Sequence, residues 1–153
     1  MVVKRVVFTT LTLFMISYIF VNSSFDAVAS DAQSLGIRKM INDMLHSLHI
    51  NITFSDYFVR KCAHFIEFFL LGCLLFCAVN SYTKKMRIIS ILAPAIGLVV
   101  AATDETIQLF SEGRSAQFSD VLLDFSGICT AVVVLCLILK MRKSKKDEEG
   151  LDE

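Results

Sequence analysis

The sequence is short of several features that soluble enzymes use. It has one proline in 153 residues, no C-x-x-C pair and no net charge, because 15 basic residues balance 15 acidic ones. A chain without net charge has no general attraction for nucleic acid. No serine or cysteine lies in a recognisable nucleophile motif, so covalent catalysis has no support in the sequence. The chain is instead rich in apolar surface, with 55% hydrophobic residues and a mean hydropathy of +0.63.

Four apolar runs account for this excess, and they begin near residues 6, 59, 88 and 120. A helix that crosses a bilayer needs about 20 mostly apolar residues. We therefore predict an all-α fold: a polytopic membrane helical bundle with four transmembrane helices, whose last three form a core over residues 55–139. All five cysteines lie inside the apolar runs, which indicates buried thiols that fill space.

The first predicted helix, within residues 1–21, has a second interpretation. Lys4 and Arg5 precede its apolar run, and the later stretch Ala27-Val28-Ala29 has the A-x-A form of a signal-peptide cleavage site. The run is long for a signal peptide, so we interpret it as a retained, signal-like anchor. A mature chain that begins at Ser30 would contradict this interpretation.

Residues 22–58 are polar and form a predicted extracytoplasmic loop. Apolar residues recur at helical spacing within this loop, at Leu35, Ile37, Met40, Ile41, Met44, Leu45 and Leu48. They predict an amphipathic helix that is too polar to span the membrane and lies in the interface or over the helix ends. On or beside it, His46 and His49 fit solvated surface residues better than ligands.

The distribution of basic residues predicts the topology. Four spans put both termini and the 80–87 turn on one side, and that side holds ten of the 15 basic residues. The positive-inside rule makes it the cytoplasmic side. The charged segment 140–153 is then a cytoplasmic tail, whose acidic part after Lys146 we expect to be disordered, and the loops at 22–58 and 111–119 face outward.

The ionisable residues of the last three spans gather at their outer ends. Such groups cost roughly 2.5–3.5 kcal/mol each at the membrane centre, so their partners are expected close by. No ionisable residue lies in the inner halves of these three spans. A general tolerance of apolar helices for a few charged residues would not restrict those residues to one end. The outer set comprises Arg60, Lys61, His64 and Glu67 in the second helix, Asp104, Glu105 and Gln108 in the third, Arg114 on the loop, and Asp120 and Asp124 in the fourth.

The spacing of these residues predicts which of them face the bundle. Residues three or four apart share one face of a helix, as do Arg60, His64 and Glu67. The same holds for Asp104 with Gln108 and for Asp120 with Asp124. We therefore predict a polar pocket between three helices, open to the outside, with Lys61 and Glu105 on its flanks. One turn beyond Asp124, Gly127 lets two helices approach closely.

Three separated motifs resemble the signature of the VanZ-like family over roughly residues 55–139. They are R-K-x-A-H-F-x-E at Arg60–Glu67, D-E-x-x-Q-x-F at Asp104–Phe110, and D-x-x-x-D-x-x-G at Asp120–Gly127, with Gly113-Arg114 on the loop between the last two. The resemblance implies a small multi-pass protein of the bacterial cytoplasmic membrane with a cell-envelope role. The family is named for a protein linked to teicoplanin resistance, and no established reaction comes with it. Many relatives carry asparagine where Asp124 stands.

The first functional hypothesis is an outward-facing binding protein. Its ligand would be an anionic envelope component, such as a lipid headgroup or a cell-wall precursor, or a glycopeptide-type antibiotic. Arginine suits such ligands because its planar guanidinium binds phosphate and carboxylate in a bidentate way. The ligand-binding residues predicted for this role are Arg60, Arg114, Gln108, Glu105, Asp120 and Asp124.

Other functions stay open. An intramembrane enzyme acting on an envelope lipid or precursor would use His64, Glu67 and Asp104 for acid/base catalysis. No cofactor is required, but His64, Glu67, Asp104 and Asp120 are candidate ligands for a divalent cation. A purely structural polar network is a further alternative, whereas the apolar inner halves of the spans disfavour a channel. Four helices are few for enclosing a site, so a homodimer is also compatible with the sequence.

Overall fold

The fold is described by a computed structural model, which covers residues 2–25, 27–49, 53–113 and 117–149, without side chains at 27–34 and 145–149. These residues form five helices and no strand, which confirms the predicted all-α class. The helices are α1 (Val2–Ser23), α2 (Ala27–Ser47), α3 (Asp56–Tyr82), α4 (Met86–Leu109) and α5 (Phe118–Glu149).

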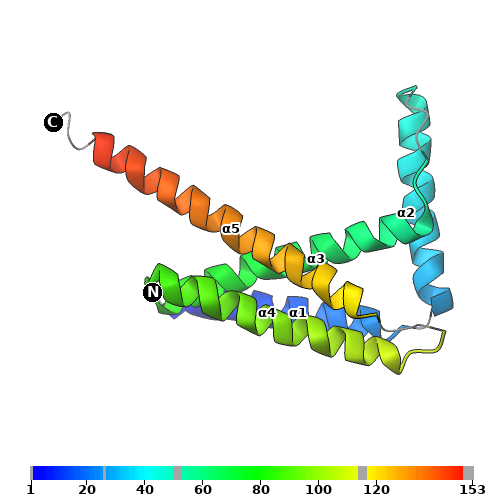
Figure 1. The fold of residues 1–153 in the computed structure, drawn as a ribbon, viewed down its shortest axis with the longest axis horizontal. Helices are drawn as coiled ribbons and strands as arrows, with labels where there is room; N and C mark the ends of the chain where they lie inside the picture. The colour runs from blue at the N-terminus through cyan, green and yellow to red at the C-terminus, as the bar shows by residue number, and fades with distance from the viewer. Residues whose placement is uncertain (1, 26, 50–52, 114–116, 150–153) are drawn as a thin grey trace.

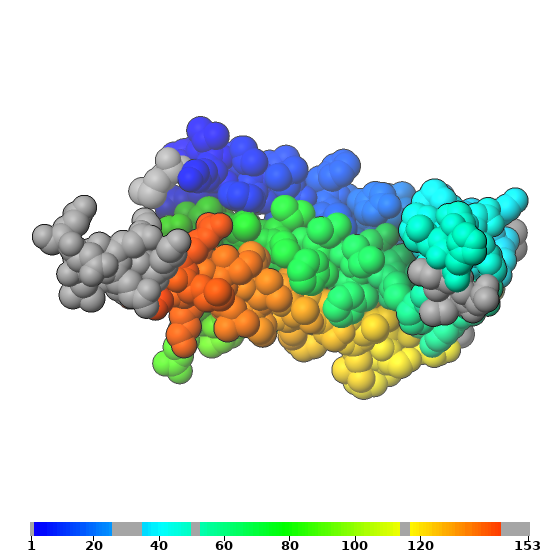
Figure 2. All heavy atoms as spheres, turned by 90° about the horizontal axis from the view of Figure 1, so that it is seen from above, coloured from blue at the N-terminus to red at the C-terminus, as the bar shows by residue number. Residues whose placement is uncertain are grey.

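Four of these helices are long and apolar enough to cross a membrane, as predicted: α1, α3, α4 and the segment Phe118–Ser144 of α5. In Figure 1, α1 and α4 run along one another, α5 lies across α3, and α2 stands across one end of the bundle. Figure 2 shows α3 between α1 and α5 on one face of the molecule. The helix α3 contacts each of the other four helices and is the centre of the fold.

The core is small because most large apolar side chains face outward. Phe68 and Leu71 of α3 pack with Ile89 of α4 and Ile128 of α5, and all four are fully buried. By contrast, large side chains on the outer faces stay exposed, for example 70% of Phe14 and 66% of Val99. An exposed apolar surface of this kind is expected where helices face lipid.

Small residues bring the helices close together. A Cβ atom built on Gly127 of α5 would lie 2.7 Å from the carbonyl oxygen of Phe65 in α3, and one built on Gly72 would lie 2.9 Å from Ala131 Cβ. These contacts are too short for any residue larger than glycine. The close approach predicted at Gly127 is therefore present in the structure, and it joins α3 to α5.

The helix ends follow local sequence signals, with one correction. Ser55 caps α3, since its hydroxyl accepts a hydrogen bond of 3.2 Å from the Phe58 amide. The last helix, however, begins at Phe118 and continues past Leu139, where we expected the span to end, to Glu149, so the expectation of a disordered acidic tail is wrong for residues 147–149. Residues 140–149 consist mainly of lysine, arginine, methionine and glutamate, which all favour helix.

The two ends of the bundle differ in charge. At one end, Arg5 of α1 donates a hydrogen bond of 3.0 Å to the Ser81 carbonyl and lies over the Tyr82 ring of α3. Lys84, Lys85 and Arg87 follow directly, so these basic residues lie together, and we call this the basic end. The opposite end holds the acidic and amide side chains described below.

The helix α2 is attached to α3 at that opposite end. Arg38 forms an ion pair of 2.7 Å with Asp56, and the Asn42 side chain accepts a hydrogen bond of 3.0 Å from the Phe54 amide. Met40 and Met44 are nevertheless 68% and 58% exposed. The apolar face of this predicted amphipathic helix is therefore not buried against the bundle.

Candidate functional site

The end of the bundle opposite the basic end collects polar side chains from four helices. We call it the polar end. It is formed by the last turn of α1, the first turns of α3, the last turns of α4 and the first turns of α5. The buried polar residues there are Ser23, Asp104, Glu105, Gln108 and Asp124. Helices from distant parts of the sequence therefore bring these side chains together inside an otherwise apolar protein.

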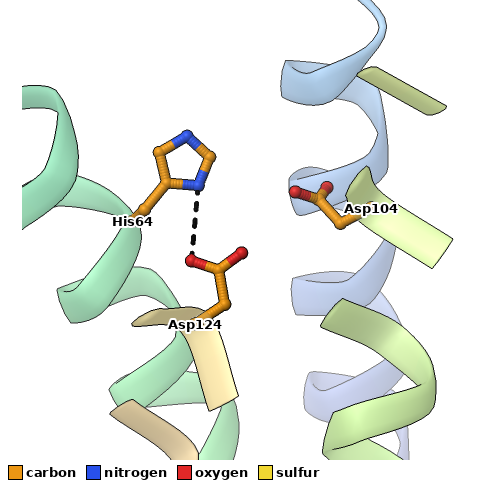
Figure 3. Close-up of side chains that lie close together, drawn as sticks. All are labelled: His64, Asp104 and Asp124. Atoms are coloured by element: carbon orange, nitrogen blue, oxygen red, sulfur yellow. Dashed lines mark ion pairs between the residues drawn. The ribbon is translucent and has the colours of Figure 1, made fainter. Parts of the chain in front are cut away.

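At the centre of the polar end lie His64 of α3, Asp104 of α4 and Asp124 of α5, which we call the triad. One potential ligand atom from each residue lies within 4.8 Å of those of the other two. Asp124 Oδ1 is 3.7 Å from His64 Nδ1, and Asp104 faces this pair across a narrow gap (Figure 3). The carboxylates are buried, whereas the His64 side chain is 23% exposed, so of the three side chains only that of His64 reaches the surface.

The Asp104 carboxylate is held from both sides. Ser23 Oγ donates a hydrogen bond to Oδ1, and Gln108 Nε2 donates one of 2.9 Å to Oδ2. Ser23, at the end of α1, was not among the predicted site residues. It follows the apolar run of the first span by one turn, but only the packing of α1 against α4 brings it to Asp104. The side chain of Asp104 is therefore fixed in its orientation.

Asp124 is buried differently. Its residue is 1% exposed, yet no described residue donates a hydrogen bond to either of its carboxylate oxygens. Most buried polar atoms in proteins have a hydrogen-bond partner, and an exception needs an explanation. A carboxylate in this position is poised to receive a proton, a cation or a ligand donor.

A second layer of contacts flanks the triad. Lys61 forms an ion pair with Asp120 and lies over the Tyr57 ring, although we expected it on the flank of the pocket. Glu105, also expected on a flank, is only 6% exposed and accepts a hydrogen bond from the Gln117 amide. The positions of these residues on their own helices did not reveal the pairings, because both partners lie where α5 begins: Gln117 directly precedes this helix and Asp120 is in its first turn.

Arg60 lies one turn before His64 and faces a separate hollow. This hollow has a volume of about 280 Å³ and is lined by Arg60, Asp56, Tyr57 and Leu35 of α2. Glu67 is half-buried one turn beyond His64 and does not belong to the triad. Arg114, the other arginine that we expected in the pocket, lies outside the described residues.

The arrangement supports two kinds of chemistry. The triad offers one imidazole nitrogen and two carboxylates within 4.8 Å, which suits proton transfer or binding of a cation. The Arg60 hollow offers a guanidinium at the level where α3 begins, which suits an anion. The polar end therefore combines a buried acidic interior with a hollow at its rim, where Arg60 lies with Asp56.

Comparison of the sequence with known proteins and protein families gives one match. No curated protein and no solved structure matches the chain. The family model described as VanZ/LLP1 matches residues 8–139, which include most of α1 as well as α3, α4 and the apolar part of α5. The match thus extends further toward the N-terminus than the three motifs do. Since it covers most of the chain, this protein is a member of the VanZ/LLP1 family of membrane proteins.

Proposed function

We propose that this protein binds an anionic group of an envelope amphiphile at the polar end of the bundle, on the outer side of a bacterial cytoplasmic membrane. The group is a phosphate, carried either by a membrane lipid or by a lipid-linked cell-wall precursor. The observation that carries this proposal is the hollow beside Arg60, which opens where α3 meets α2. Guanidinium groups bind phosphate in a bidentate way, and they keep their charge at any physiological pH.

The surroundings of the Arg60 hollow support an amphiphilic ligand. A neighbouring hollow of about 390 Å³ shares Leu35 and is lined by three basic side chains, Arg38, Lys39 and His46, and by one acidic side chain, Asp43, among others. Basic side chains thus lie along the junction of α2 and α3, and exposed apolar residues such as Met40 lie beside them. The headgroup of an amphiphile can contact these basic side chains while its acyl or prenyl chain stays with the apolar residues and the bilayer.

The distribution of charge supports the outward orientation. The N-terminal turn of α1, the 83–87 connection and the last turns of α5 contain ten of the 15 basic residues. Basic segments of this kind remain in the cytoplasm during insertion. With the basic end inside, the polar end and α2 face the cell wall. A protein that occupies a lipid-linked precursor there would reduce the access of a glycopeptide such as teicoplanin to it.

Binding can be measured on the full chain in lipid nanodiscs. We expect added anionic phospholipid or polyprenyl diphosphate to raise the thermal unfolding temperature of the wild-type protein, because a ligand that binds only the folded state stabilises it. In Arg60→Gln, the rise in unfolding temperature should disappear. It should disappear for both lipids if both bind to the wild type, and for one lipid if only that lipid is the ligand. Arg87→Gln, which removes an exposed arginine at the basic end, is the matched control and should keep this rise.

The two lipids distinguish the possible sources of the phosphate. A response to the polyprenyl diphosphate alone identifies a precursor-binding protein, whereas an equal response to both identifies a headgroup site. If the wild-type protein responds to neither, or if Arg60→Gln responds as the wild type does, the proposal is wrong.

A second candidate function is acid/base catalysis on the same bound amphiphile. The observation that favours it is the 3.7 Å separation of His64 Nδ1 from Asp124 Oδ1, next to a partly exposed imidazole. A carboxylate behind a histidine stabilises its protonated form, as in other acid/base sites. Incubation with radiolabelled lipid distinguishes the two functions, because an enzyme releases a labelled product and a binding protein does not. If the protein is an enzyme, the His64→Gln variant should release no labelled product.

A further inference from the structure

The triad contains a buried group that the proposed anion site does not use. Asp124 is 1% exposed, and both of its oxygens lack a hydrogen bond from the described residues. Figure 3 shows its carboxylate directed toward His64 and toward the space in front of Asp104. A buried carboxylate without a donor is costly unless a positive charge compensates for it.

The distances within the triad suit a single ion. Three ligand atoms at roughly tetrahedral angles around one ion, with metal–ligand bonds of about 2.1 Å, lie about 3.4 Å apart. The triad atoms lie within 4.8 Å of one another, and His64 Nδ1 is 3.7 Å from Asp124 Oδ1. Side-chain rotations that bring a pair of these atoms together by up to about 1.4 Å would therefore close the triad around an ion.

Charge and ligand type narrow the choice of ion. Two aspartates and a neutral histidine carry two negative charges, which a divalent cation balances. Imidazole nitrogen favours transition metals, whereas calcium and magnesium prefer sites made only of oxygen. Manganese and zinc accept one nitrogen together with carboxylates. Three protein ligands also leave coordination positions open for water or for a phosphate oxygen.

The neighbours of Asp104 act as further support for such a site. Ser23 and Gln108 donate hydrogen bonds to the two oxygens of this carboxylate and fix its orientation. Hydrogen bonds that orient the ligands are typical of metal sites. The triad differs from the set of metal ligands predicted from the sequence. It contains Asp124 in place of Glu67 and Asp120, and Asp120 forms an ion pair with Lys61.

We propose that His64, Asp104 and Asp124 bind one divalent transition-metal ion, of the Mn²⁺ or Zn²⁺ type, at the polar end of the bundle. The inference goes beyond the anion site, because it concerns different side chains and needs no lipid ligand. An ion held there would lie beside the partly exposed His64 side chain and would present positive charge to a phosphate that enters the polar end.

The test uses the full-length protein in detergent, stripped with a chelator and then titrated with MnCl₂, with free Mn²⁺ followed by electron paramagnetic resonance. The wild type should bind one Mn²⁺ per chain, and ZnCl₂ should displace it. Asp124→Asn and His64→Gln should bind about tenfold more weakly or worse. The matched control Asp43→Asn removes an exposed carboxylate near His46 on α2 and should bind as the wild type does.

Asp124→Asn preserves the size of the side chain, and circular dichroism with gel filtration shows whether each variant is folded. If the wild type binds no stoichiometric Mn²⁺ or Zn²⁺, or if folded Asp124→Asn binds as tightly as the wild type, the metal site is refuted. Loss of binding in Asp43→Asn instead would assign the metal to the surface of α2 and refute it as well. None of these results depends on the lipid response of Arg60.

Discussion

Replacing Gly127 with alanine should force α3 and α5 apart. The added Cβ would lie 2.7 Å from the Phe65 carbonyl oxygen and 3.1 Å from the Phe69 amide nitrogen, and ordinary contacts begin near 3.4 Å. The helix backbones must therefore separate by about 0.7 Å, because neither of these atoms belongs to a flexible side chain. Overpacking of this kind costs about 1–3 kcal/mol.

The same change acts on the triad. Phe65 directly follows His64, and Gly127 lies one turn beyond Asp124, so separation of the helices lengthens the 3.7 Å contact between His64 and Asp124. We expect Gly127→Ala to weaken Mn²⁺ binding as well as stability. A substitution that contacts no ligand would then alter the site through the helix packing alone.

Thermal unfolding in detergent measures the stability effect, with Gly36→Ala as the control. Nothing lies within 4 Å of a Cβ built on Gly36 in α2, so this change adds only the better helix propensity of alanine, about 1 kcal/mol. Gly127→Ala gains the same propensity but adds the overpacking. The two variants should thus differ by about 1–3 kcal/mol, or by roughly 2–12 °C for a chain of this size. Equal unfolding temperatures would refute the close packing of α3 on α5.

Three further predictions concern the ends of the helices. Ser23→Ala removes the donor to Asp104 Oδ1 and should lower stability by about 1–3 kcal/mol, whereas Ser24→Ala, at an exposed serine that bonds only within its own helix, should have little effect in the same unfolding assay. Mass spectrometry of the protein purified from membranes should find α1 retained, because Ser23 and the buried Ile19 are part of the packed structure; a chain that starts at Ser30 would contradict this. The last prediction uses a variant without native cysteines. In intact cells, Lys39→Cys should react with a membrane-impermeant thiol reagent, whereas Lys85→Cys should react only after permeabilisation. The reverse pattern would show that the topology is inverted.

The architecture of the bundle could be predicted from the sequence because hydropathy acts locally. Each apolar run is long enough to identify a span, and residues three or four apart indicated that the polar side chains share helix faces. The four membrane-length helices were obtained in this way, whereas the family was indicated by the resemblance of three sequence motifs. The end of α5 was missed because a charged tail does not look like a membrane span, although its residues favour helix.

The partners within the polar end could not be predicted in the same way. Whether Asp104 and Asp124 reach His64 depends on how α4 and α5 are rotated against α3, and the Gly127 contact fixes α5 on α3. The pairing of Lys61 with Asp120 depends on where α5 begins. The role of Ser23 depends on α1 packing against α4, more than 80 residues away in the sequence. These are tertiary relations, and no local pattern encodes them.

The unfolding temperature of Asp124→Asn, measured with chelator and without added lipid, tests most directly whether the polar end is a ligand site or a structural lock. The two carboxylate oxygens of Asp124 accept no hydrogen bond from the described residues. If Asp124 is held for a ligand, removal of its buried charge should therefore leave the unfolding temperature unchanged or raise it. If the triad instead serves to lock the helices, loss of the charge opposite His64 should cost about 3–5 kcal/mol. A fall in unfolding temperature of that size would contradict the account given for this site.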